Sequence, residues 1–471
     1  MKISPLSLGV IHFVGIGGIG MSGIAEILHG LGQKVQGSDI THNPNVQRLE
    51  EKGISVFIGH KKENIEKANV LVVSSAIGGH NPEIEEAQRR GIAIVHRSEM
   101  LAQLARLKFS AIVAGSHGKT TTTSLIAAIF DAALLDPTVI NGGIITAYGT
   151  NARLGAGDWM VIESDESDGS FVELTPTVAV ITNIDPEHLE HYGSFEVLKE
   201  SFQSFMKKIP FYGFGVLCID HPVVEELISK STNKILLTYG FSEKAHVRAL
   251  NVVREKDKTT FDVEIKLPQK PVVLWQGIQM SLMGDHNIQN ALAALTVAHK
   301  LEIPRGFIQE ALASFAGVKR RFTKVSEALG ITIYDDYAHH PVEISATLKT
   351  ALNIAPKRVI SVLQPHRYSR VSQLMEDFSE SVTGSNYVCV VPIYSAGEAP
   401  IEGIDHEILS SKMEARGIPV MCLSGKEELF ENLASFVEEG DIILFMGAGT
   451  ISQWAYAFPE FLLNFKKKSL G

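Results

Sequence analysis

Two glycine-rich loops, about a hundred residues apart, constrain this chain more than any other feature of its sequence. The first loop, residues 15–20, reads GIGGIG and follows the apolar run 10–14. The second, residues 115–121, reads GSHGKTT and follows the apolar run 109–114. A glycine turn between a strand and a helix lets backbone amides approach a phosphate, and the helix N-terminus adds positive potential. The sequence therefore predicts two separate phosphate-binding sites.

Only the second loop carries the side chains that a nucleoside triphosphate needs. Lys119 follows Gly118 directly, and Thr120 and Thr121 come next. A lysine neutralises the β- and γ-phosphates, and a threonine hydroxyl is a ligand for the accompanying Mg²⁺. The G-x-x-x-x-G-K-T pattern would place glycine at position 113, where this chain has Val113. We interpret the loop as an ATP site, against the alternative of a glycine turn that serves folding alone.

The first loop allows three interpretations. Its G-x-G-x-x-G pattern is followed, about twenty residues on, by Asp39. This arrangement is typical of NAD binding, in which the acidic residue binds the ribose. The same loop and the same acid suit a UDP-linked ligand. The glycines also suit a turn that merely lets a helix pack against the sheet.

Size and composition limit the class of protein. The chain has 471 residues, of which 45% are hydrophobic and 20% charged, which predicts a globular enzyme of two to four domains. A net charge of −10 argues against a nucleic-acid partner but not against anionic nucleotides held in a cleft. Cys218, Cys389 and Cys422 are scattered, as reduced thiols in a cytosolic protein would be. No apolar run is long enough to span a bilayer. We expect a cytoplasmic enzyme without a membrane partner, as a monomer or weak homodimer.

Strands alternate with helices along the whole chain, which predicts an α/β fold in three domains. We expect an N-terminal Rossmann-like parallel sheet in residues 1–107, a central P-loop-type ATPase domain in 108–317 and a C-terminal Rossmann-like domain in 318–471. The strands expected in the first domain are 10–16, 34–39, 69–74 and 92–95, with a helix at 21–31. Those in the second are 109–114, 159–162, 177–181, 216–219 and 234–239, with helices at 120–135 and 287–300 and an alternating stretch at 247–267. Those in the third are 331–334, 359–363, 387–391, 419–423 and 441–446.

Polar clusters follow two strands of the predicted central sheet. Residues 163–168 read ESDESD, and residues 182–188 read TNIDPEH. Ligands of α/β proteins bind at the carboxyl ends of strands, so Glu163, the first residue past its predicted strand, is our choice for a Mg²⁺ ligand. His188 suits Mg²⁺ less well because this ion prefers oxygen. From the residues alone, a surface histidine is the favoured interpretation of His188.

Further candidates lie later in the chain. Asn287 and Asn290 share a face of the helix predicted at 287–300, where their amides would suit an adenine edge; a plain helix capped by Asp285 or His286 is an equal alternative. In the third domain, DDYAHHP (335–341) and QPHRYSR (364–370) follow strands. Arginines of the second cluster would clamp a carboxylate or phosphoryl group, unless they are solvated surface residues. Arg320 and Arg321, between the second and third domains, would reach the γ-phosphate.

Taken together, the stretches GSHGKTTTT, ESDESD, TNIDPEH, GDHNIQN, DDYAHHP and QPHRYSR match, in order and spacing, the Mur ligase family, which the chain resembles from about residue 10 to residue 451. This family builds the peptide stem of the bacterial cell wall. The resemblance implies an ATP-dependent ligase that activates a carboxylate as an acyl phosphate and joins it to an amine. The opening GIGGIGMSGIAEIL is similar to that of members that join L-alanine to UDP-N-acetylmuramate. Members that return a tripeptide to the same sugar have a different first loop.

The resemblance also implies roles for individual residues. The nucleotide would contact Gly115, Ser116, His117, Gly118, Lys119, Thr120, Thr121, Asn287, Asn290, Arg321 and Asp335. Mg²⁺ would be held by Thr120, Glu163 and His188, which reverses the interpretation of His188 above. The UDP portion would contact Gly17, Gly18, Ile19 and Asp39. Catalysis would rest on Lys119, His339, Arg367 and Arg370, with His339 orienting or deprotonating the amine.

Two functions of other classes compete with a ligase. A nicotinamide-dependent oxidoreductase would use the loop at 15–20 but leaves Lys119, Glu163 and the third domain without a role. A nucleotide-switched binding protein would bind ATP without chemistry on a second substrate. The choice of acceptor among alanine, glycine and serine stays open on the sequence.

Overall fold

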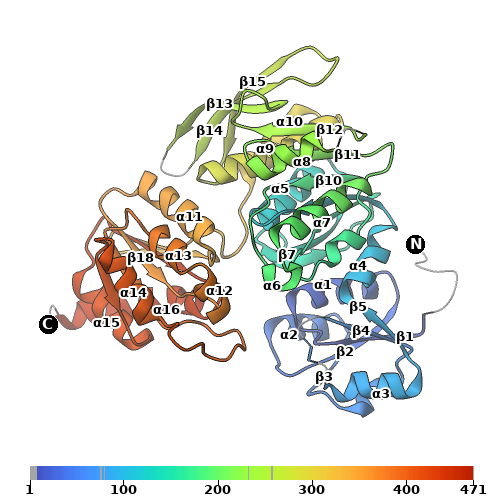
Figure 1. Ribbon diagram of the computed structural model, residues 1–471, viewed down its shortest axis with the longest axis horizontal. Helices are drawn as coiled ribbons and strands as arrows, with labels where there is room; N and C mark the ends of the chain where they lie inside the picture. Colours follow the sequence, from blue (N-terminus) through green and yellow to red (C-terminus); the bar gives the residue numbers. More distant parts are fainter. Residues whose placement is uncertain (1–7, 75–76, 79, 232, 256–257, 470–471) are drawn as a thin grey trace. The chain divides into compact units, whose positions relative to one another are not determined.

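The computed structural model describes residues 8–74, 77–78, 80–231, 233–255 and 258–469. They form two compact units, each described here by itself. The first contains the described residues up to 254 together with 258–282 and 287–317, and the second contains residue 255, residues 283–286 and the described residues from 318 onward. Within the described residues, two β-sheets lie in the first unit and one in the second (Figure 1). The chain is thus a three-domain α/β protein.

The N-terminal domain is a parallel sheet of the Rossmann kind. Within the described residues it has five strands in the order β3-β2-β1-β4-β5. Their bounds are β1 Val10–Val14, β2 Lys34–Asp39, β3 Ser55–Ile58, β4 Val70–Val73 and β5 Ala93–His96. The helices are α1 Ile19–Gly30, α2 Pro44–Glu51, α3 Pro82–Arg90 and α4 Arg97–Ala105, with a 3₁₀ turn at Lys62–Ile65. Strand β3 is absent from the sequence prediction, and α1 begins two residues earlier than expected.

The central sheet combines a parallel core with antiparallel edges. Its strands, within the described residues, follow the order β15-β14-β13-β12-β11-β10-β6-β9-β7-β8. Their bounds are β6 Phe109–Ala114, β7 Thr138–Ile145, β8 Thr150–Arg153, β9 Trp159–Glu163, β10 Val178–Ile181, β11 Phe214–Cys218, β12 Leu236–Gly240, β13 Val247–Arg254, β14 Thr259–Ile265 and β15 Val273–Met280. Strands β13 to β15 form an antiparallel extension at one end (Figure 1). The alternating stretch at 247–267 is therefore the pair β13 and β14, whose partner β15 the prediction missed, as it missed β7 and β8.

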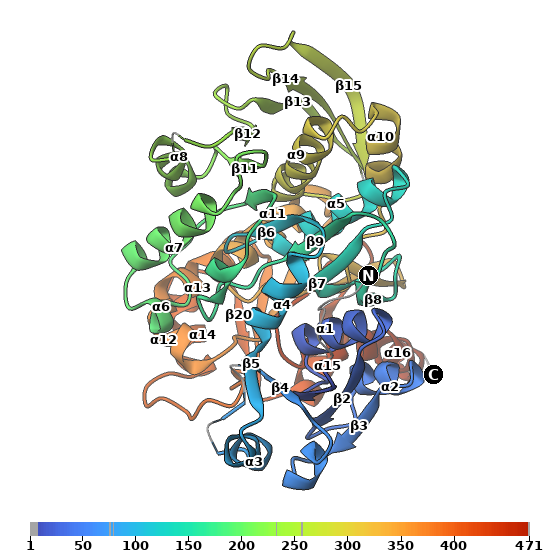
Figure 2. The same ribbon diagram turned by 90° about the vertical axis from the view of Figure 1, so that its right-hand side faces the viewer.

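Helices cover the central sheet and connect it to the N-terminal domain. Their bounds are α5 Lys119–Ala132, α6 Leu189–Tyr192, α7 Phe195–Lys207, α8 Pro222–Ser229, α9 Asp285–Lys300 and α10 Arg305–Ser314, with a 3₁₀ turn at Ser170–Glu173. Helix α1 packs against β7 and β8, and α4 packs against the 3₁₀ turn (Figure 2). One apolar core, which includes Ile24, Leu101 and Ile112, runs through both domains. Burial of this shared surface explains why the two domains form one compact unit.

The C-terminal domain has its own sheet, in the order β16-β17-β21-β18-β19-β20 within the described residues. The strands are β16 Thr323–Ala328, β17 Ile331–Asp336, β18 Val359–Leu363, β19 Tyr387–Val390, β20 Val420–Cys422 and β21 Ile442–Met446. The helices are α11 Pro341–Ile354, α12 Tyr368–Gln373, α13 Met375–Ser381, α14 His406–Ala415, α15 Lys426–Phe436 and α16 Ile451–Ser469. The sheet is parallel except for β16, an edge strand the prediction missed. None of the helices in the described residues has both the length and the apolar character of a membrane crossing.

Candidate active site

The order of the central strands brings three polar loops together. Strand β6 lies between β10 and β9, and all three run parallel. The loops at 115–118, 164–168 and 182–188 therefore leave the same carboxyl edge of the sheet side by side. These are the segments GSHG, SDESD and TNIDPEH that the sequence singled out. The fold thus places a basic loop between two acidic ones.

The second glycine loop adopts a shape that requires glycine at two positions. Gly115 has φ +132° and Gly118 has φ +80°. A Cβ atom on Gly115 would lie 2.2 Å from Oγ1 of Thr182, and one on Gly118 would lie 2.5 Å from Oδ1 of Asn290. Both the backbone conformation and the lack of space exclude larger residues. The loop is therefore closely packed between two neighbouring segments.

The neighbouring loop after β10 holds the glycine loop in place. The hydroxyl of Thr182 donates to the carbonyl of His117 at 2.6 Å, and the His117 amide donates to Oδ1 of Asn183 at 2.7 Å. The Asp185 amide donates to Oγ of Ser116 at 2.8 Å. These bonds fix the loop backbone before any ligand arrives, which is the preorganisation that a phosphate site needs.

Asp185 also connects two histidines. Its Oδ2 lies 3.2 Å from Nε2 of His117, and its Oδ1 lies 3.3 Å from Nε2 of His221. Burial by itself would raise the pKa of Asp185, but the interactions with both imidazoles outweigh it and hold the pKa well below its usual range. Asp185 is therefore ionised at neutral pH and orients the His117 ring. Sequence reasoning missed this residue, although it lies within TNIDPEH.

Lys119, the first residue of α5, folds back over its own loop. Its Nζ donates to the carbonyl of Gly115 at 2.6 Å, to that of Ser116 at 2.9 Å and to Oε1 of Glu166 at 2.8 Å. Burial by itself would lower the pKa of Lys119, but the charge of Glu166, with further contributions from Glu163 and Glu187, raises it. Lys119 is thus a fully charged ammonium surrounded by acidic side chains.

Glu166, the partner of Lys119, lies in a buried place near other carboxylates. Burial and the nearby carboxylates raise its pKa to about 7, although Lys119 opposes this change. Its Oε2 is buried without a hydrogen-bond partner. One ligand atom each from Glu166, Glu187 and His188 lies within 4.8 Å of the others. This surplus of oxygen donors fits a hard divalent cation such as Mg²⁺.

The predicted metal ligands fall into two adjoining places. The hydroxyl of Thr120 donates to Oε1 of Glu163 at 3.0 Å, and the Gly142 amide donates to Oε2 of Glu163 at 2.6 Å. His188 belongs instead with Glu166 and Glu187. Glu163 is the last residue of β9 and not the first residue after it, which corrects the expectation from sequence. The strand register places its carboxylate beside the first turn of α5.

The two asparagines of α9 are buried beside the phosphate loop. Oδ1 of Asn290 accepts from the Thr122 hydroxyl at 3.1 Å, and its Nδ2 donates to Oδ1 of Asn287 at 3.1 Å. Helix α9 begins at Asp285, so neither Asp285 nor His286 is its cap, contrary to the capping alternative. The close approach of Asn290 to Gly118 shows that this residue packs against the glycine loop itself.

The first glycine loop is also held by its own domain. The amides of Gly15 and Ile16 donate to the carbonyl of Ser38 at 2.8 and 2.9 Å. Oδ2 of Asp39 accepts from the Gly17 amide at 2.9 Å. Gly18 precedes α1, and Ile19, its first residue, is 40% exposed. The Asp39 carboxylate therefore orders the loop that was expected to share a ligand with it.

In the second unit, one polar cluster begins within the last two residues of β17 and continues after it, so Asp335 belongs to the strand and does not follow it as expected. Asp335 is buried, and its Oδ2 accepts from the Ser452 hydroxyl at 2.6 Å, while burial raises its pKa. His339 Nδ1 lies 3.2 Å from Glu343, and the Arg321 guanidinium lies 3.8 Å from the same carboxylate. The guanidinium also lies over the ring of Tyr337, at 5.4 Å from its centroid. His339 and Arg321 are thus organised by one acid, Glu343, that the sequence analysis did not single out.

A basic cluster follows β18 in the same unit. The His366 ring lies 5.6 Å from that of His339 and stacks on Tyr394. Burial and the nearby cations, Arg370 and Arg367 among them, lower the pKa of His366 to about 3. Arg367 has φ +67°, and Nη1 of Arg370 is buried without a hydrogen-bond partner. This concentration of positive charge suits an anionic group.

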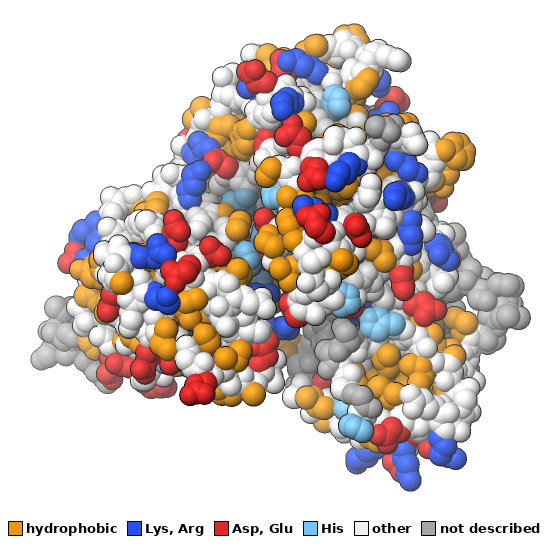
Figure 3. Space-filling model, in the orientation of Figure 1, with side chains coloured by type: hydrophobic (Ala, Val, Ile, Leu, Met, Phe, Trp, Pro, Cys, Tyr) orange, Lys and Arg blue, Asp and Glu red, His pale blue; other side chains and the backbone are white. Residues whose placement is uncertain are grey.

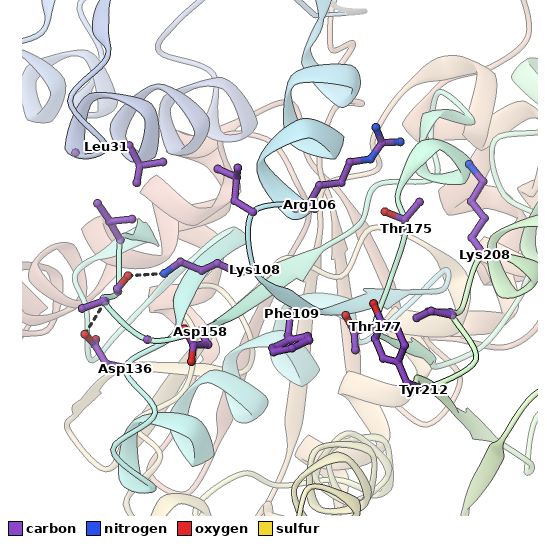
Figure 4. Close-up of a pocket in the computed structure, with 18 residues that line it drawn as sticks. Leu31, Arg106, Lys108, Phe109, Asp136, Asp158, Thr175, Thr177, Lys208 and Tyr212 are labelled. Atoms are coloured by element: carbon purple, nitrogen blue, oxygen red, sulfur yellow. Dashed lines mark hydrogen bonds between the residues drawn. The ribbon is translucent and has the colours of Figure 1, made fainter. Parts of the chain in front are cut away.

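A cavity of about 980 Å³ lies at the opposite edge of the central sheet, near the amino ends of β6, β9 and β10 (Figure 4). Arg106 and Lys208 lie just beyond the C-terminal ends of α4 and α7, whose negative potential they offset. Burial lowers the pKa of Lys108, whose Nζ donates to the Gly155 carbonyl at 2.6 Å. The cavity lies at the edge of the sheet opposite to the one from which the three polar loops leave.

Acidic and basic side chains are interspersed on the molecular face shown in Figure 3. The chain carries 53 acidic and 43 basic residues, so neither sign dominates strongly. The concentrations of charge that matter for the site are local ones. They are the acidic side chains around Lys119 and the arginines near His366.

Comparison with known proteins agrees with this geometry. Three family models match in order: the Mur ligase family catalytic domain over residues 10–109, the Mur ligase middle domain over 113–298 and the Mur ligase glutamate ligase domain over 320–449. A UDP-N-acetylmuramate–L-alanine ligase of Granulibacter bethesdensis is 52% identical over 471 residues, which cover 100% of this chain and 98% of the relative.

Two solved structures resemble the whole chain. A UDP-N-acetylmuramate–alanine ligase of Thermotoga maritima has a TM-score of 0.81 at 28% identity and covers 98% of this chain and 100% of its own. A murein peptide ligase of Psychrobacter arcticus has a TM-score of 0.71 at 22% identity and covers 97% of this chain and 99% of its own. This second likeness is one of fold. The three matched models, the full-length relative and the lysine-bearing loop between two acidic loops all agree: the chain belongs to the Mur ligase family.

Proposed function

We propose that this chain joins L-alanine to the carboxylate of UDP-N-acetylmuramate and converts ATP to ADP and phosphate, a step of peptidoglycan synthesis. One observation carries the substrate assignment: a ligase of that name is 52% identical over the full length. The lysine-bearing loop supports the use of ATP, because Lys119 and two threonines occupy the positions that bind phosphates.

The reaction has two steps. A muramate carboxylate oxygen attacks the γ-phosphorus of ATP; an O–P bond forms, the bond to ADP breaks, and an acyl phosphate results. The neutral amine of L-alanine then attacks the acyl carbon, the C–O bond to phosphate breaks, and the amine loses a proton as the amide forms. Both reactants of the first step are anions, so the site must neutralise their repulsion.

Lys119 is the residue we assign to the β- and γ-phosphates. Its ammonium is held by Glu166 and by two carbonyls of the loop. Glu166 then loses its cation when the phosphates take over Lys119. We assign Mg²⁺ to Thr120, Glu163 and His188, with Glu166 and Glu187 beside them. When bound, Mg²⁺ neutralises phosphate charge and orients the phosphoryl group.

Residues of the second unit supply the remaining roles in this proposal. Arg367 and Arg370 would hold the anionic groups of the acceptor and the phosphoryl group, which the basic surroundings of His366 support. His339, with Nδ1 near Glu343, would orient or deprotonate the amine. Arg321 and Asp335 would contact the nucleotide, as would Asn287 and Asn290 at the phosphate loop. Because an acyl phosphate hydrolyses in water, the site must exclude water while this intermediate is present.

The UDP portion is assigned to the first glycine loop. Gly17, Gly18 and Ile19 lie at the start of α1, where backbone amides and helix potential favour a diphosphate. Asp39 would act by fixing the Gly17 amide. Because ATP and a nucleotide sugar are cytoplasmic metabolites, we place the reaction in the cytoplasm, with the chain as a monomer or weak homodimer.

The test is ADP release from purified protein with Mg²⁺, ATP, UDP-N-acetylmuramate and one acceptor at a time. The proposal expects ADP release that needs both the sugar nucleotide and L-alanine, with glycine and L-serine weaker. Release that requires a tripeptide acceptor would favour the recycling reaction, and release without any acceptor would favour a nucleotide switch. Tight NADH binding would revive the oxidoreductase alternative.

A further inference from the structure

A buried carboxylate of the N-terminal domain, Glu83, has no role in the function proposed above. Glu83, near the start of α3, is fully buried. Its Oε2 accepts from the Ser38 hydroxyl at 2.6 Å, and its Oε1 accepts from Asn64 Nδ2 at 2.6 Å and from the Lys61 amide at 3.3 Å. Each oxygen therefore faces donors from β2 or from the segment that follows β3.

Two imidazoles complete this environment. Nε2 of His12 lies 3.4 Å from Oε2 of Glu83, and Nδ1 of His60 lies 3.3 Å from the same oxygen. Burial alone would raise the pKa of Glu83, but the hydrogen bonds from His12, Ser38 and Asn64 outweigh it and lower the pKa to about 2. The group is thus a buried, ionised carboxylate.

Ser38 connects this carboxylate to the first glycine loop. Its hydroxyl donates to Glu83, while its carbonyl accepts from the amides of Gly15 and Ile16. The next residue, Asp39, accepts from the Gly17 amide. The end of β2 therefore sets the position of three successive loop residues, and Glu83 fixes the end of β2.

His60 provides a second connection. It follows β3 directly after Gly59, whose amide donates to the Asp39 carbonyl at 2.7 Å. Its Nδ1 faces Ser38 at 3.0 Å and Glu83 at 3.3 Å, and its side chain keeps 15% exposure. The contacts to Ser38 and Glu83 use Nδ1 of His60. Its other ring nitrogen, Nε2, lies on a different side of the imidazole and is the one that could face a ligand.

We infer that Glu83 is a positioning residue for the sugar nucleotide: it fixes the amides of the first glycine loop through Ser38 and the ring of His60, without touching the ligand. The inference rests on the proposed function, which assigns the UDP portion to this loop. The new element is Glu83, the group that sets the geometry of the first glycine loop. A residue that served only the folding of the domain would affect all substrates alike.

The test is Glu83→Gln, which keeps the shape but replaces one acceptor oxygen with an amide donor that faces other donors. We expect KM for UDP-N-acetylmuramate to rise at least tenfold, while kcat and the KM values for ATP and L-alanine stay within twofold. Glu85→Gln is the matched control, because Glu85 lies on the same helix with its side chain 59% exposed. It should leave every constant unchanged.

A second variant keeps the inference testable if Glu83→Gln folds poorly. Ser38→Ala removes the hydroxyl link but retains the carbonyl that holds Gly15 and Ile16, and we expect KM for the sugar nucleotide to rise about threefold. Calorimetric titration of UDP-N-acetylmuramate without ATP separates the two proposals. No binding by the wild-type chain would contradict the proposed function and this inference together. Wild-type binding that both variants retain, or a parallel loss for all substrates, would contradict this inference alone.

Discussion

Nζ of Lys119 lies 2.8 Å from Oε1 of Glu166, in an ion pair whose two side chains are largely buried. The ammonium that should hold ATP is thus paired with a carboxylate of its own chain. Phosphates that take over Lys119 leave Glu166 without its cation, at a place where Glu187 and His188 also lie. ATP and Mg²⁺ should therefore bind cooperatively. ATP takes Lys119 away from Glu166, and Mg²⁺ supplies positive charge near Glu166 in its place.

Replacement of Lys119 by alanine should lower turnover at least a thousandfold, because Lys119 is the ammonium assigned to both the β- and the γ-phosphate within the glycine loop itself. The measurement is alanine-dependent ADP release at saturating substrates. Lys207→Ala, at the exposed end of α7, is the control and should keep wild-type turnover. Near-normal turnover of the Lys119 variant would remove the loop from the mechanism.

The double variant Lys119→Ala with Glu166→Gln separates charge balance from catalysis. Lys119→Ala alone leaves a buried carboxylate without its partner, so Tm should fall. The added Glu166→Gln removes that charge and should recover most of the lost Tm without recovering turnover. If turnover returned with Tm, Lys119 would be a structural residue only.

Glu166→Gln should raise the Mg²⁺ concentration for half-maximal turnover about tenfold, because a neutral amide is a weaker ligand for a hard cation than a carboxylate. The measurement is a Mg²⁺ titration of initial rates at fixed ATP. Glu190→Gln is the matched control, since Glu190 lies 3.6 Å from His188 but has a side chain 59% exposed. An unchanged Mg²⁺ requirement in the Glu166 variant would exclude Glu166 from the metal site.

Gly118→Ala should raise KM for ATP at least tenfold, because its Cβ would lie 2.5 Å from Oδ1 of Asn290 in a backbone conformation with φ +80°. The control is Gly149→Ala: this residue has φ +66°, with no atom within 4 Å of the added Cβ. Both variants carry a similar backbone cost of roughly 1 kcal/mol. Only the first should change ATP binding; equal effects would show that backbone strain alone is responsible.

The stability of the N-terminal domain should depend on pH through Glu83. Its pKa is about 2 in the folded chain against an ordinary value of 4.5. Because the folded state binds fewer protons, the stabilisation of about 3 kcal/mol is present above pH 4.5 and is lost as the pH falls toward 2. The Tm difference between wild type and Glu83→Gln should therefore shrink from pH 6 to pH 3.5. A constant difference would contradict an ionised Glu83.

The α/β class and the parallel core strands could be predicted from sequence because buried strands are continuous apolar runs. Strands β6 and β18 are largely apolar and lie at the predicted residues. Strand β2 also lies where it was predicted, although its sequence KVQGSD is mostly polar. Strands β3 and β16 lie at sheet edges. Strand β16 has no apolar run, and the apolar run of β3 is only three residues long and largely exposed. The hairpin of β7 and β8 contains Asn141, Gly142 and Gly143, residues typical of turns, and only its pairing with β9 explains it as a sheet.

The places of Lys119 at the start of α5 and of Glu163 at the end of β9 follow from local sequence patterns, while their roles stay predictions. The partners of those residues depend on three-dimensional neighbours that no local pattern reveals. Glu166 lies three residues after Glu163 in the same acidic run, and the sequence does not distinguish it from a solvent-exposed acid. The structure does, because its Oε2 is buried. Asp39 was predicted to contact a ligand because of its spacing after the first glycine loop. In the structure its carboxylate accepts a hydrogen bond from the Gly17 amide.

The most direct test of the account is transfer of oxygen from the carboxylate to phosphate. UDP-N-acetylmuramate labelled with ¹⁸O in both carboxylate oxygens is incubated with ATP, Mg²⁺, L-alanine and the purified chain, and the products are analysed by mass. The account predicts a product heavier by one alanine residue that keeps one ¹⁸O, with the other ¹⁸O in the released phosphate. Unlabelled phosphate, or no gain of alanine, would contradict it.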